Sequence, residues 1–346
     1  MLRYLYNLAT DQERGFIAGI LKIFLFICSL FYGLVIRILL FFSLLKPDRL
    51  NCKVISVGNI TVGGTGKTTL VEFIARYLAG RGRKLAVLSR GYKRAVGIGD
   101  EPLMLRRRLP DVPVIVDANR RRGANRAVSE YGLDTVILDD GFQQWRLKKD
   151  LEIVTIDATD PFGNRQMLPR GILREPLSSL KRADIFVLTK TNLNPDTQEI
   201  KDFLRSINAK AAVFEAMHNP AGFYKIDKPS LFFGADVFRG RQVTLVCGIG
   251  DPDSFENLVD NLGIKVGLSL RFPDHHNYAP YDMDHIARAS KNKGIDTIIT
   301  TEKDAVRLPQ PGAGSWELGV FVLGIELKIN KNEEEFFSRL DRIYNL

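Results

Sequence analysis

A glycine-rich stretch that ends in one lysine and two threonines forms the clearest chemical pattern in the chain. The segment Lys53–Val57 has the Val and Ile content of a buried strand, glycines stand at 58, 63, 64 and 66, and an apolar helical pattern follows Lys67. Glycines let successive backbone N–H groups converge on phosphate oxygens, and the N-terminus of the following helix adds positive potential. Strand, glycine loop and helix in this order predict a phosphate-binding loop, or P-loop.

Within this loop, Lys67 is expected to reach the β- and γ-phosphates of a nucleotide, and the Thr68 hydroxyl to ligate magnesium. The first glycine of the usual GxxxxGK[ST] spacing is replaced by Thr61, so the strict motif is not met. The residues predicted to bind the nucleotide are Thr61, Val62, Gly63, Gly64, Thr65, Gly66, Lys67, Thr68 and Thr69.

Two carboxylates follow a second apolar run, at Asp139 and Asp140. Phosphate-binding loops work with a metal-holding carboxylate at the end of a neighbouring strand. We therefore expect Asp139, Asp140 and Thr68 to form a Mg²⁺ site. Asp139 is assigned to the metal itself and Asp140 to a supporting or substrate role, although the order of the two is open. An ordinary Asp-Gly turn after a strand is the alternative interpretation.

These residues need a sheet to position them, and the sequence after Pro47 alternates short β-branched runs with longer amphipathic stretches. This alternation is typical of a parallel sheet covered by helices. We predict a P-loop NTPase-type, doubly wound, mostly parallel α/β fold with a second, smaller α/β domain. The expected strands are Lys53–Val57, Leu85–Leu88, Val114–Val116, Thr135–Leu138, Ile153–Ile156, Ile185–Leu188, Val243–Cys247, Lys265–Leu270 and Thr297–Thr300.

Changes in composition suggest five regions along the chain. They are an N-terminal membrane-associated helix (1–46), a P-loop core (47–220), a connection (221–240), the smaller α/β domain (241–330) and a C-terminal helix (331–346).

The segment from Phe16 to Leu45 is almost wholly apolar apart from Lys22 and Arg37. The 14 uncharged residues between these charges cover about 21 Å as a helix, short of the roughly 30 Å hydrocarbon core of a bilayer. The two charges lie about 60° apart on a helical wheel. We therefore favour a helix lying in or partly inserted into a membrane surface over a clean span. A buried core helix is the alternative.

Bulk composition limits the classes of protein and partner that remain possible. With 346 residues and 45% apolar content, the chain can bury at least one full core. The three cysteines, Cys28, Cys52 and Cys247, are too far apart for a metal cluster and odd in number, so a reducing cytosol fits best. A net charge of +9 favours an anionic partner without choosing among nucleic acid, lipid and phosphorylated substrate.

Several short strings are spread in order over residues 47–310. They are 59–69 (Asn-Ile-Thr-Val-Gly-Gly-Thr-Gly-Lys-Thr-Thr), 89–92 (Ser-Arg-Gly-Tyr), 99–102 (Gly-Asp-Glu-Pro), 139–143 (Asp-Asp-Gly-Phe-Gln), 173–176 (Leu-Arg-Glu-Pro), 272–275 (Phe-Pro-Asp-His) and 301–306 (Thr-Glu-Lys-Asp-Ala-Val). Together they resemble one family, the tetraacyldisaccharide 4'-kinases that phosphorylate a lipid A precursor.

This resemblance implies ATP as phosphoryl donor, Mg²⁺ as cofactor and the 4'-hydroxyl of a tetraacylated glucosamine disaccharide 1-phosphate as acceptor. It also implies a location at the cytoplasmic face of the inner membrane, with neither a nucleic acid nor an inferable protein partner. Asp100 matches the acidic residue proposed to activate the hydroxyl, and His275 the histidine thought to partner it. Together with Lys67 they are the expected catalytic residues. Asn59, Arg120 and Arg174 are the expected substrate contacts.

Two positions depart from the family pattern. Gln144 stands where a histidine is usual and cannot titrate near neutral pH, and Lys93-Arg94 replace small residues. A regulatory nucleotide switch is the rival interpretation because Thr189-Lys190-Thr191-Asn192 resembles a guanine-reading loop, although Asn192 replaces its decisive aspartate. A nucleic-acid-binding ATPase is a third, supported by charge alone.

Overall fold

The computed structural model describes residues 2–90, 99–309 and 318–344. In it the P-loop follows a central strand of a parallel sheet, at the strand's C-terminal end. The chain divides into two compact units: unit 1 comprises 1–92, 108–218 and 327–346, and unit 2 comprises 93–107 and 219–326. Each unit is interrupted in sequence. Residues 93–107 of unit 2 stand between two segments of unit 1, and β7 (Ala212–Lys225) and β12 (Gly319–Ile329) both run from one unit into the other.

The sheet of unit 1 has the strand order β7-β6-β5-β1-β4-β2-β3, and its described neighbours pair in parallel. The strands are β1 (Lys53–Gly58), β2 (Leu85–Ser89), β3 (Val114–Val116), β4 (Thr135–Asp139), β5 (Leu151–Asp157), β6 (Ile185–Thr189) and the first part of β7. Since β1 and β4 are adjacent, Val57 and Asp139 are register partners. The expected parallel α/β fold is confirmed, and the predicted strands are all present within a few residues.

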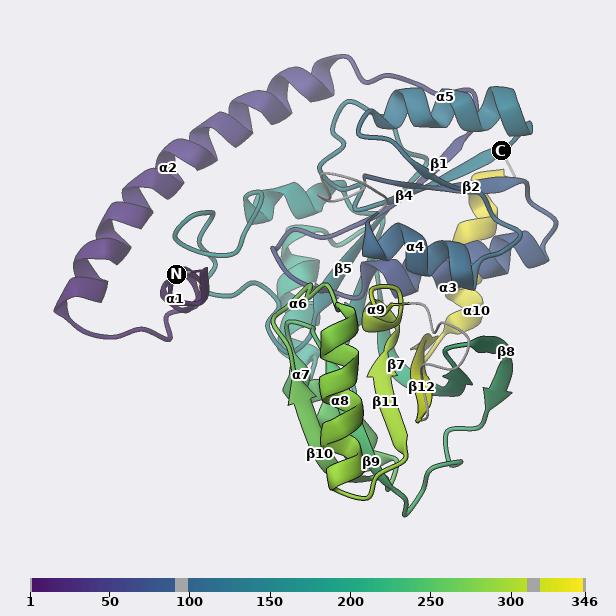
Figure 1. Cartoon of the computed structure of the whole chain (residues 1–346). Helices are drawn as coiled ribbons and strands as arrows, with labels where there is room; N and C mark the ends of the chain where they lie inside the picture. Colours follow the sequence, from purple (N-terminus) through teal and green to yellow (C-terminus); the bar gives the residue numbers. More distant parts are fainter. Residues whose placement is uncertain (1, 91–98, 310–317, 345–346) are drawn as a thin grey trace. The chain divides into compact units, whose positions relative to one another are not determined.

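Helices cover both faces of this sheet (Figure 1). They are α3 (Lys67–Gly80), α5 (Arg120–Tyr131), α6 (Gln198–Ile207), the short η1 (Leu177–Arg182) and, near the end of the chain, α10 (Glu333–Asp341) and η2 (Arg342–Tyr344). Ala124 and Ala127 of α5 share a core with Val136 and Leu138 of β4. Phe337 of α10 stacks on α3, its ring centroid 3.9 Å from that of Tyr77.

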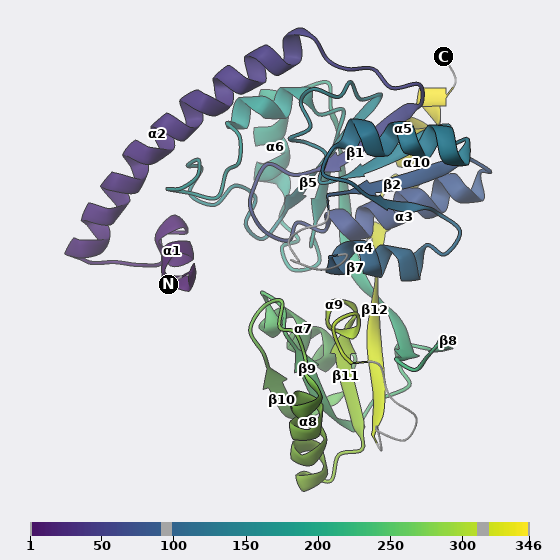
Figure 2. The same ribbon diagram turned by 45° about the horizontal axis from the view of Figure 1, so that its top comes forward.

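Unit 2 contains the strands β10-β9-β11-β12 in that order, again parallel. Its elements are α4 (Asp100–Arg108, which reaches unit 1 at its last residue), β8 (Lys228–Phe233), β9 (Gln242–Cys247), α7 (Pro252–Asn261), β10 (Lys265–Arg271), α8 (Pro280–Asn292), β11 (Thr297–Thr301) and α9 (Glu302–Ala305), and Figure 2 labels them. Ile299 packs with α7, and its neighbour Ile298 packs with Ile286 of α8. Because successive strand residues face opposite ways, α7 and α8 cover opposite faces.

Three strands were not anticipated. Residues 221–240, expected as a connection, contain the end of β7 and all of β8, which pair antiparallel. Pro220 and Gly222 lie inside β7, and such residues argue against a strand interior, which is why the pattern was not recognised. β12 was also missed.

The N-terminal helices α1 (Leu2–Ala9) and α2 (Phe16–Leu45) belong to unit 1. By length and composition α2 could cross a membrane, but 22% of its most apolar 18-residue window is buried within the structure. Ser29, Gly33, Ile36 and Leu40 form one buried stripe. Most large apolar side chains on its other faces are exposed, among them Phe24, Phe31, Phe41 and Phe42.

Candidate active site

The loop between β1 and α3 has the backbone of a phosphate cradle. Gly63 and Gly66 have φ angles of +123° and +74°, which side-chain-bearing residues rarely adopt. Gly66 precedes α3, and no side chain caps this helix. The first N–H groups of a helix lack internal partners, so those of α3 are oriented for an anion. Thr68 and Thr69, predicted nucleotide contacts, lie in this first turn.

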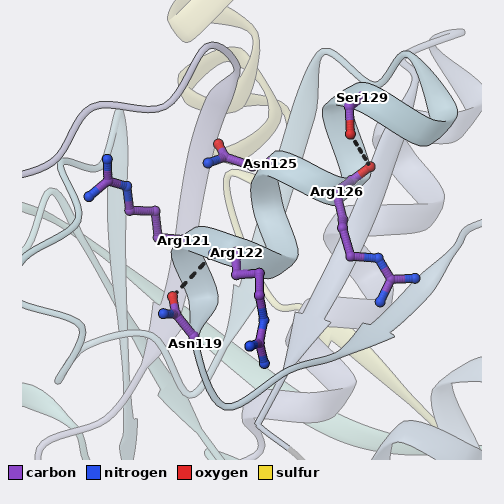
Figure 3. A pocket seen from close by; sticks show the side chains of 6 residues that line it. All are labelled: Asn119, Arg121, Arg122, Asn125, Arg126 and Ser129. Atoms are coloured by element: carbon purple, nitrogen blue, oxygen red, sulfur yellow. Dashed lines mark hydrogen bonds between the residues drawn. The ribbon is translucent and has the colours of Figure 1, made fainter.

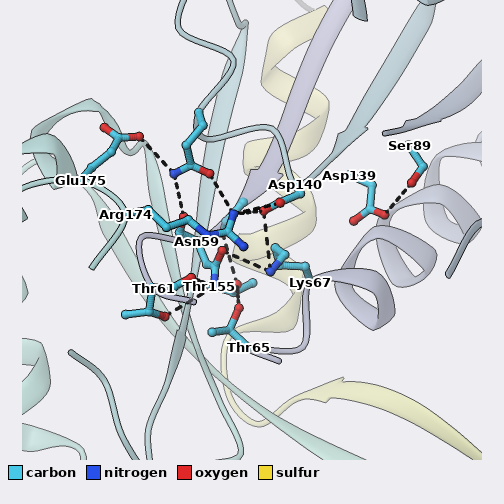
Figure 4. Close-up of polar contacts among 12 residues, drawn as sticks. Asn59, Thr61, Thr65, Lys67, Ser89, Asp139, Asp140, Thr155, Arg174 and Glu175 are labelled. Carbon is cyan, nitrogen blue, oxygen red and sulfur yellow. Dashed lines mark hydrogen bonds and ion pairs between the residues drawn. The ribbon is translucent and has the colours of Figure 1, made fainter. Parts of the chain in front are cut away.

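The ammonium group of Lys67 is held between two partners on the strand side of the loop. Its Nζ donates to Oδ1 of Asn59 at 3.1 Å and lies 3.7 Å from Oδ1 of Asp140 (Figure 4). Asn59 is fully buried, and its Nδ2 donates to the carbonyl of Thr61 at 2.8 Å. Asn59 was predicted to contact the substrate. In this geometry it orients Lys67 and the loop.

Asp140 carries a second cation. Nη1 of Arg174 lies 2.9 Å from each carboxylate oxygen of Asp140, so three predicted site residues from distant segments meet here. Burial alone would raise the pKa of Asp140, but the charges of Lys67 and Arg174 outweigh burial and hold this pKa below its ordinary value. Asp140 is therefore an ionised carboxylate shared by two cations.

Asp139, the other predicted metal ligand, is the last residue of β4 and is buried. Its Oδ2 accepts from the hydroxyl of Ser89 at 3.4 Å. The backbone carbonyl of Asp139 accepts from Nη2 of Arg120 at 3.0 Å, and that of Asp117 accepts from Nη1 at 2.8 Å. Arg120 is only 2% exposed. Its role as a substrate contact stays a prediction, whereas its contacts with the backbone fix the turn that carries Asp139 and Asp140.

A buried network behind Arg174 was missed as a functional unit, although Gln143 and Glu175 lie in the strings that carry the resemblance. Gln143 accepts from Nη1 of Arg174 at 3.1 Å and donates to the fully buried Glu175 at 3.1 Å. Glu175 also accepts from Trp145 and from Nη1 of Arg182, both at 2.9 Å. Gln143 and Glu175 thereby fix the side chain that binds Asp140.

Other loop residues have structural partners within unit 1. The hydroxyls of Thr65 and Thr155 lie 2.7 Å apart, and Thr189 donates to the carbonyl of Thr65. Thr61 forms a β-bridge with Leu173, and the N–H of Val62 donates to Ile172 at 2.8 Å. These contacts attach both ends of the loop to the sheet and to the 172–174 segment.

His218 is a further neighbour of the loop that sequence reasoning missed. Its Nε2 lies 2.9 Å from the hydroxyl of Thr69, and a Cβ at Gly66 would lie 2.8 Å from its ring. His218, a residue of β7, therefore packs against the P-loop at Gly66 and Thr69. A single histidine in an alternating strand gives no sequence signal for such a contact.

The two remaining catalytic candidates meet in unit 2. Asp100 is the first residue of α4, and its Oδ2 lies 3.1 Å from Nδ1 of His275. The same oxygen accepts from Nε of Arg307 at 2.8 Å. The Asp100 side chain is 13% exposed and that of His275 is 68% exposed. Residues 175 apart in sequence are therefore paired as expected, with an arginine that the sequence did not indicate.

The arginine-rich start of α5 lines a shallow hollow of about 470 Å³ (Figure 3). Arg122 pairs with Asp117 through two 2.8 Å hydrogen bonds, and Arg126 pairs with Glu130. Arg121 lies 3.3 Å from Asp48. These internal pairings fit a solvated helix face better than an anion site. The hollow's lining residues are Asn119, Arg121, Arg122, Asn125, Arg126 and Ser129.

Some sequence features remain without structural test. Gly91, Tyr92, Lys93 and Arg94 lie outside the described residues. Gln144, the substitute for the usual histidine, is half-buried, and its N–H donates to the carbonyl of Gly141.

The segment 189–192, which resembles a guanine-binding loop, makes structural contacts within unit 1. Lys190 pairs with Asp157 at 2.6 Å, and the Thr191 hydroxyl donates to the carbonyl of Ala216. These contacts brace the ends of β5, β6 and β7, and they give the rival switch interpretation no support.

Comparison with known proteins identifies the family. Residues 21–345 match the family described as tetraacyldisaccharide-1-P 4'-kinase. Relatives named tetraacyldisaccharide 4'-kinase include one from Halothermothrix orenii, 38% identical with 94% of each chain covered, and one from Elusimicrobium minutum, 37% identical over 86% of this chain and 84% of the relative. The fold matches a crystal structure of LpxK from Aquifex aeolicus in complex with ATP, with a TM-score of 0.75, 30% identity, and 93% of this chain and 99% of that one covered. The chain belongs to the tetraacyldisaccharide-1-phosphate 4'-kinase family.

Proposed function

We propose that this chain transfers the γ-phosphoryl group of Mg-ATP to the 4'-hydroxyl of a tetraacylated glucosamine disaccharide 1-phosphate. The bond from the 4'-oxygen to the γ-phosphorus forms as the bond from that phosphorus to the β–γ bridging oxygen breaks. ADP leaves, and the hydroxyl proton passes to the enzyme. Family membership supports both the donor and the acceptor.

The observation that carries the proposal is the cluster of Lys67 and Arg174 on Asp140, at the mouth of a glycine loop. Two cations share one carboxylate, so the cluster keeps net positive charge for a phosphate group. In phosphoryl transfer the charge spreads over the γ-phosphoryl oxygens, and positioned cations stabilise it. Lys67 would bind the β- and γ-phosphates, and Asn59 would keep it aimed at them.

The residues present fit a magnesium ion. Among the described residues, no three His, Cys, Asp or Glu side chains converge to hold a metal by themselves. Mg²⁺ at such sites is usually bound by one or two carboxylates together with phosphate oxygens and water. Thr68 and Asp139 would provide protein oxygens for it, with Asp140 beside them. When bound, the ion neutralises charge on the transferring phosphate.

Asp100 and His275 supply the proton chemistry in this proposal. A hydroxyl that attacks phosphorus must be oriented and must lose its proton. Asp100 would accept that proton, and His275 would orient the carboxylate through their 3.1 Å contact.

We further propose that α2 lies along the cytoplasmic face of the inner membrane rather than across it. Its exposed phenylalanines and leucines favour a lipid surface. Its buried stripe and the 3.0 Å hydrogen bond from the Tyr32 hydroxyl to the carbonyl of Arg174 favour continued attachment to unit 1. Lys22 pairs with Asp11 at 2.7 Å, so this charge has a partner outside the lipid.

The deciding experiment incubates the purified, detergent-solubilised protein with Mg-ATP and a tetraacyl disaccharide 1-phosphate. We expect a mass gain of one phosphate on the lipid, and near-complete loss of product with a folded Asp100→Ala variant. Lipid-independent nucleotide hydrolysis without product would contradict the proposal. Omitting magnesium from the same assay tests the cofactor, and co-sedimentation with anionic vesicles tests the membrane contact.

A further inference from the structure

Arg307 of unit 2 lies two residues after α9 and has a completely buried side chain. Its side chain has 0% exposure, and its Nε donates to Oδ2 of Asp100 at 2.8 Å. Its Nη1 donates to the carbonyl of Gly248 at 2.9 Å and lies 3.4 Å from Oδ1 of Asp304. With no exposed surface, Arg307 cannot act as a phosphate contact. Its whole charge is directed at neighbouring side chains and backbone.

Asp304 anchors this arginine and belongs to the 301–306 string, to which no role has been assigned. Asp304 is fully buried and surrounded by donors: the N–H of Gly248 at 3.0 Å, the hydroxyl of Tyr278 at 3.0 Å and that of Thr301 at 2.6 Å. Burial raises the pKa of Asp304, and the donors together with Arg307 oppose that rise. An environment made only of donors suits an ionised carboxylate.

The arrangement also selects a tautomer of His275. Nδ1 of His275 lies 3.1 Å from Oδ2 of Asp100 and 3.3 Å from Nη2 of Arg307. Arg307 stabilises Asp100 in its ionised form, which can only accept hydrogen bonds. The contact with Asp100 is the shorter one and favours a proton on Nδ1 of His275, whereas the longer contact with Nη2 of Arg307 would need Nδ1 as an acceptor. A neutral ring that carries its proton on Nδ1 leaves Nε2 as an acceptor.

We propose that Arg307, anchored by Asp304, is a positioning residue that keeps Asp100 ionised and His275 in its Nδ1–H form, ready for proton transfer from the substrate hydroxyl. This inference rests on the proposed function. It explains why one fully buried and one largely buried carboxylate surround a single guanidinium, an arrangement that is costly unless every member has a partner.

The kinetic test compares Arg307→Lys, which keeps the charge but loses the forked geometry, with Arg307→Gln, which loses the charge. Both should lower kcat about 100-fold through misplacement of Asp100, with the KM for ATP nearly unchanged. In Arg307→Gln, the acidic limb of the pH profile of kcat should move up by about one unit, because the Asp100 carboxylate loses its neighbouring cation and binds a proton more readily. The other titratable groups nearby are unaltered: Asp274 lies 3.9 Å from Nε2 of His275, Asp304 contacts Arg307, and Tyr278 donates to Asp304.

In Arg307→Lys the acidic limb of the pH profile of kcat should not move, because the positive charge is kept. Arg271→Gln is the matched control, because Arg271 is a partly exposed arginine of the same unit that pairs with Asp253 and Glu256. It should leave the profile unchanged. A loss of activity that only follows the folded fraction, with no movement of the limb in Arg307→Gln, overturns the proposal. If the Arg307 variants do not fold, Asp304→Asn, which retains shape, should lower kcat in the same way.

A second readout is independent of kinase activity. The chain has four histidines, so the ring nitrogens of His275 can be assigned by NMR against a His275→Gln variant. We expect the Nδ1–H form in the wild type and a larger share of the Nε2–H form in Arg307→Gln, because Asp100 is no longer held in place beside Nδ1. An Nε2–H ring in the wild type, or unchanged tautomer populations in Arg307→Gln, overturns the proposal even if the wild type makes product. The expected NMR result without product would reject the proposed function and keep the positioning role.

Discussion

The two candidate clusters use the same groups in opposite proportions. In unit 1, two cations, Lys67 and Arg174, share one carboxylate, Asp140. In unit 2, two carboxylates, Asp100 and Asp304, share one cation, Arg307. A cluster with surplus positive charge suits an anion, whereas surplus negative charge suits a proton. Charge ratio, rather than residue type, distinguishes the phosphate role from the proton role.

The two clusters also differ in how much of each cationic side chain is exposed to solvent. Lys67 and Arg174 keep 13% and 20% of their side-chain surface, so both can reach a ligand. Arg307 has none, and the most exposed member of the second cluster is His275. These exposures agree with the proposed roles, in which the two cations of the first cluster bind phosphate and the single cation of the second positions its neighbours.

The largest expected effect on kcat/KM comes from removing Lys67, one of the two cations of the unit 1 cluster. Lys67→Met should reduce kcat/KM by about a thousandfold, because a preorganised charge on the transferring phosphate is lost. Phosphate transfer to the lipid measures it, with the exposed Lys84→Met as control. Activity within tenfold of the wild type would break the comparison.

Arg174→Met tests whether the second cation holds Asp140 ionised. We expect about a hundredfold lower kcat/KM and a less stable fold near neutral pH, by about 2 kcal/mol. The pKa of Asp140 is lowered in the folded wild type, so the stabilisation exists above the unfolded pKa and is lost as pH falls through the folded one. Urea unfolding at several pH values should show the wild-type advantage shrinking below about pH 4. A gap that persists at lower pH would contradict this role for Arg174.

A His218 variant tests how the P-loop of unit 1 is held in its conformation for ATP. His218→Ala should raise the KM for ATP about tenfold and leave kcat nearly unchanged, because it removes the hydrogen bond to Thr69 and one wall of the loop at Gly66. His218→Gln, which can still reach a hydroxyl, should recover part of the loss. Lipid phosphorylation measured over a range of ATP concentrations, at saturating lipid, gives both constants. Equal losses in a Thr69→Val background and in the wild type would show that the two residues act separately.

The smallest effect is expected from α2. Tyr32→Phe removes only the hydroxyl that donates to the carbonyl of Arg174, and should lower kcat about threefold. Vesicle binding should stay unchanged, since the apolar surface is intact. A drop in vesicle binding with normal kcat in detergent would assign Tyr32 to the membrane instead of the site.

Much of the phosphate side could be predicted from the sequence because it is built from local order. The glycine loop lies between a strand and a helix, and Asp139 ends a strand, so parallel pairing of β1 with β4 brings them to one sheet edge. The resemblance added Asp100 and His275, whose contact confirms that they are close. Their chemical roles stay predictions.

The sequence by itself determined the parallel α/β fold, the phosphate loop and the apolar N-terminal helix, because these depend on periodicity and glycine placement along short segments. Only the tertiary structure decided which cations share which carboxylate. Arg174, Arg307 and His218 reach their partners across long stretches of chain, and Arg120 is buried against the backbone of its own sheet. Such pairings depend on strand order and side-chain direction in space, which no local pattern encodes.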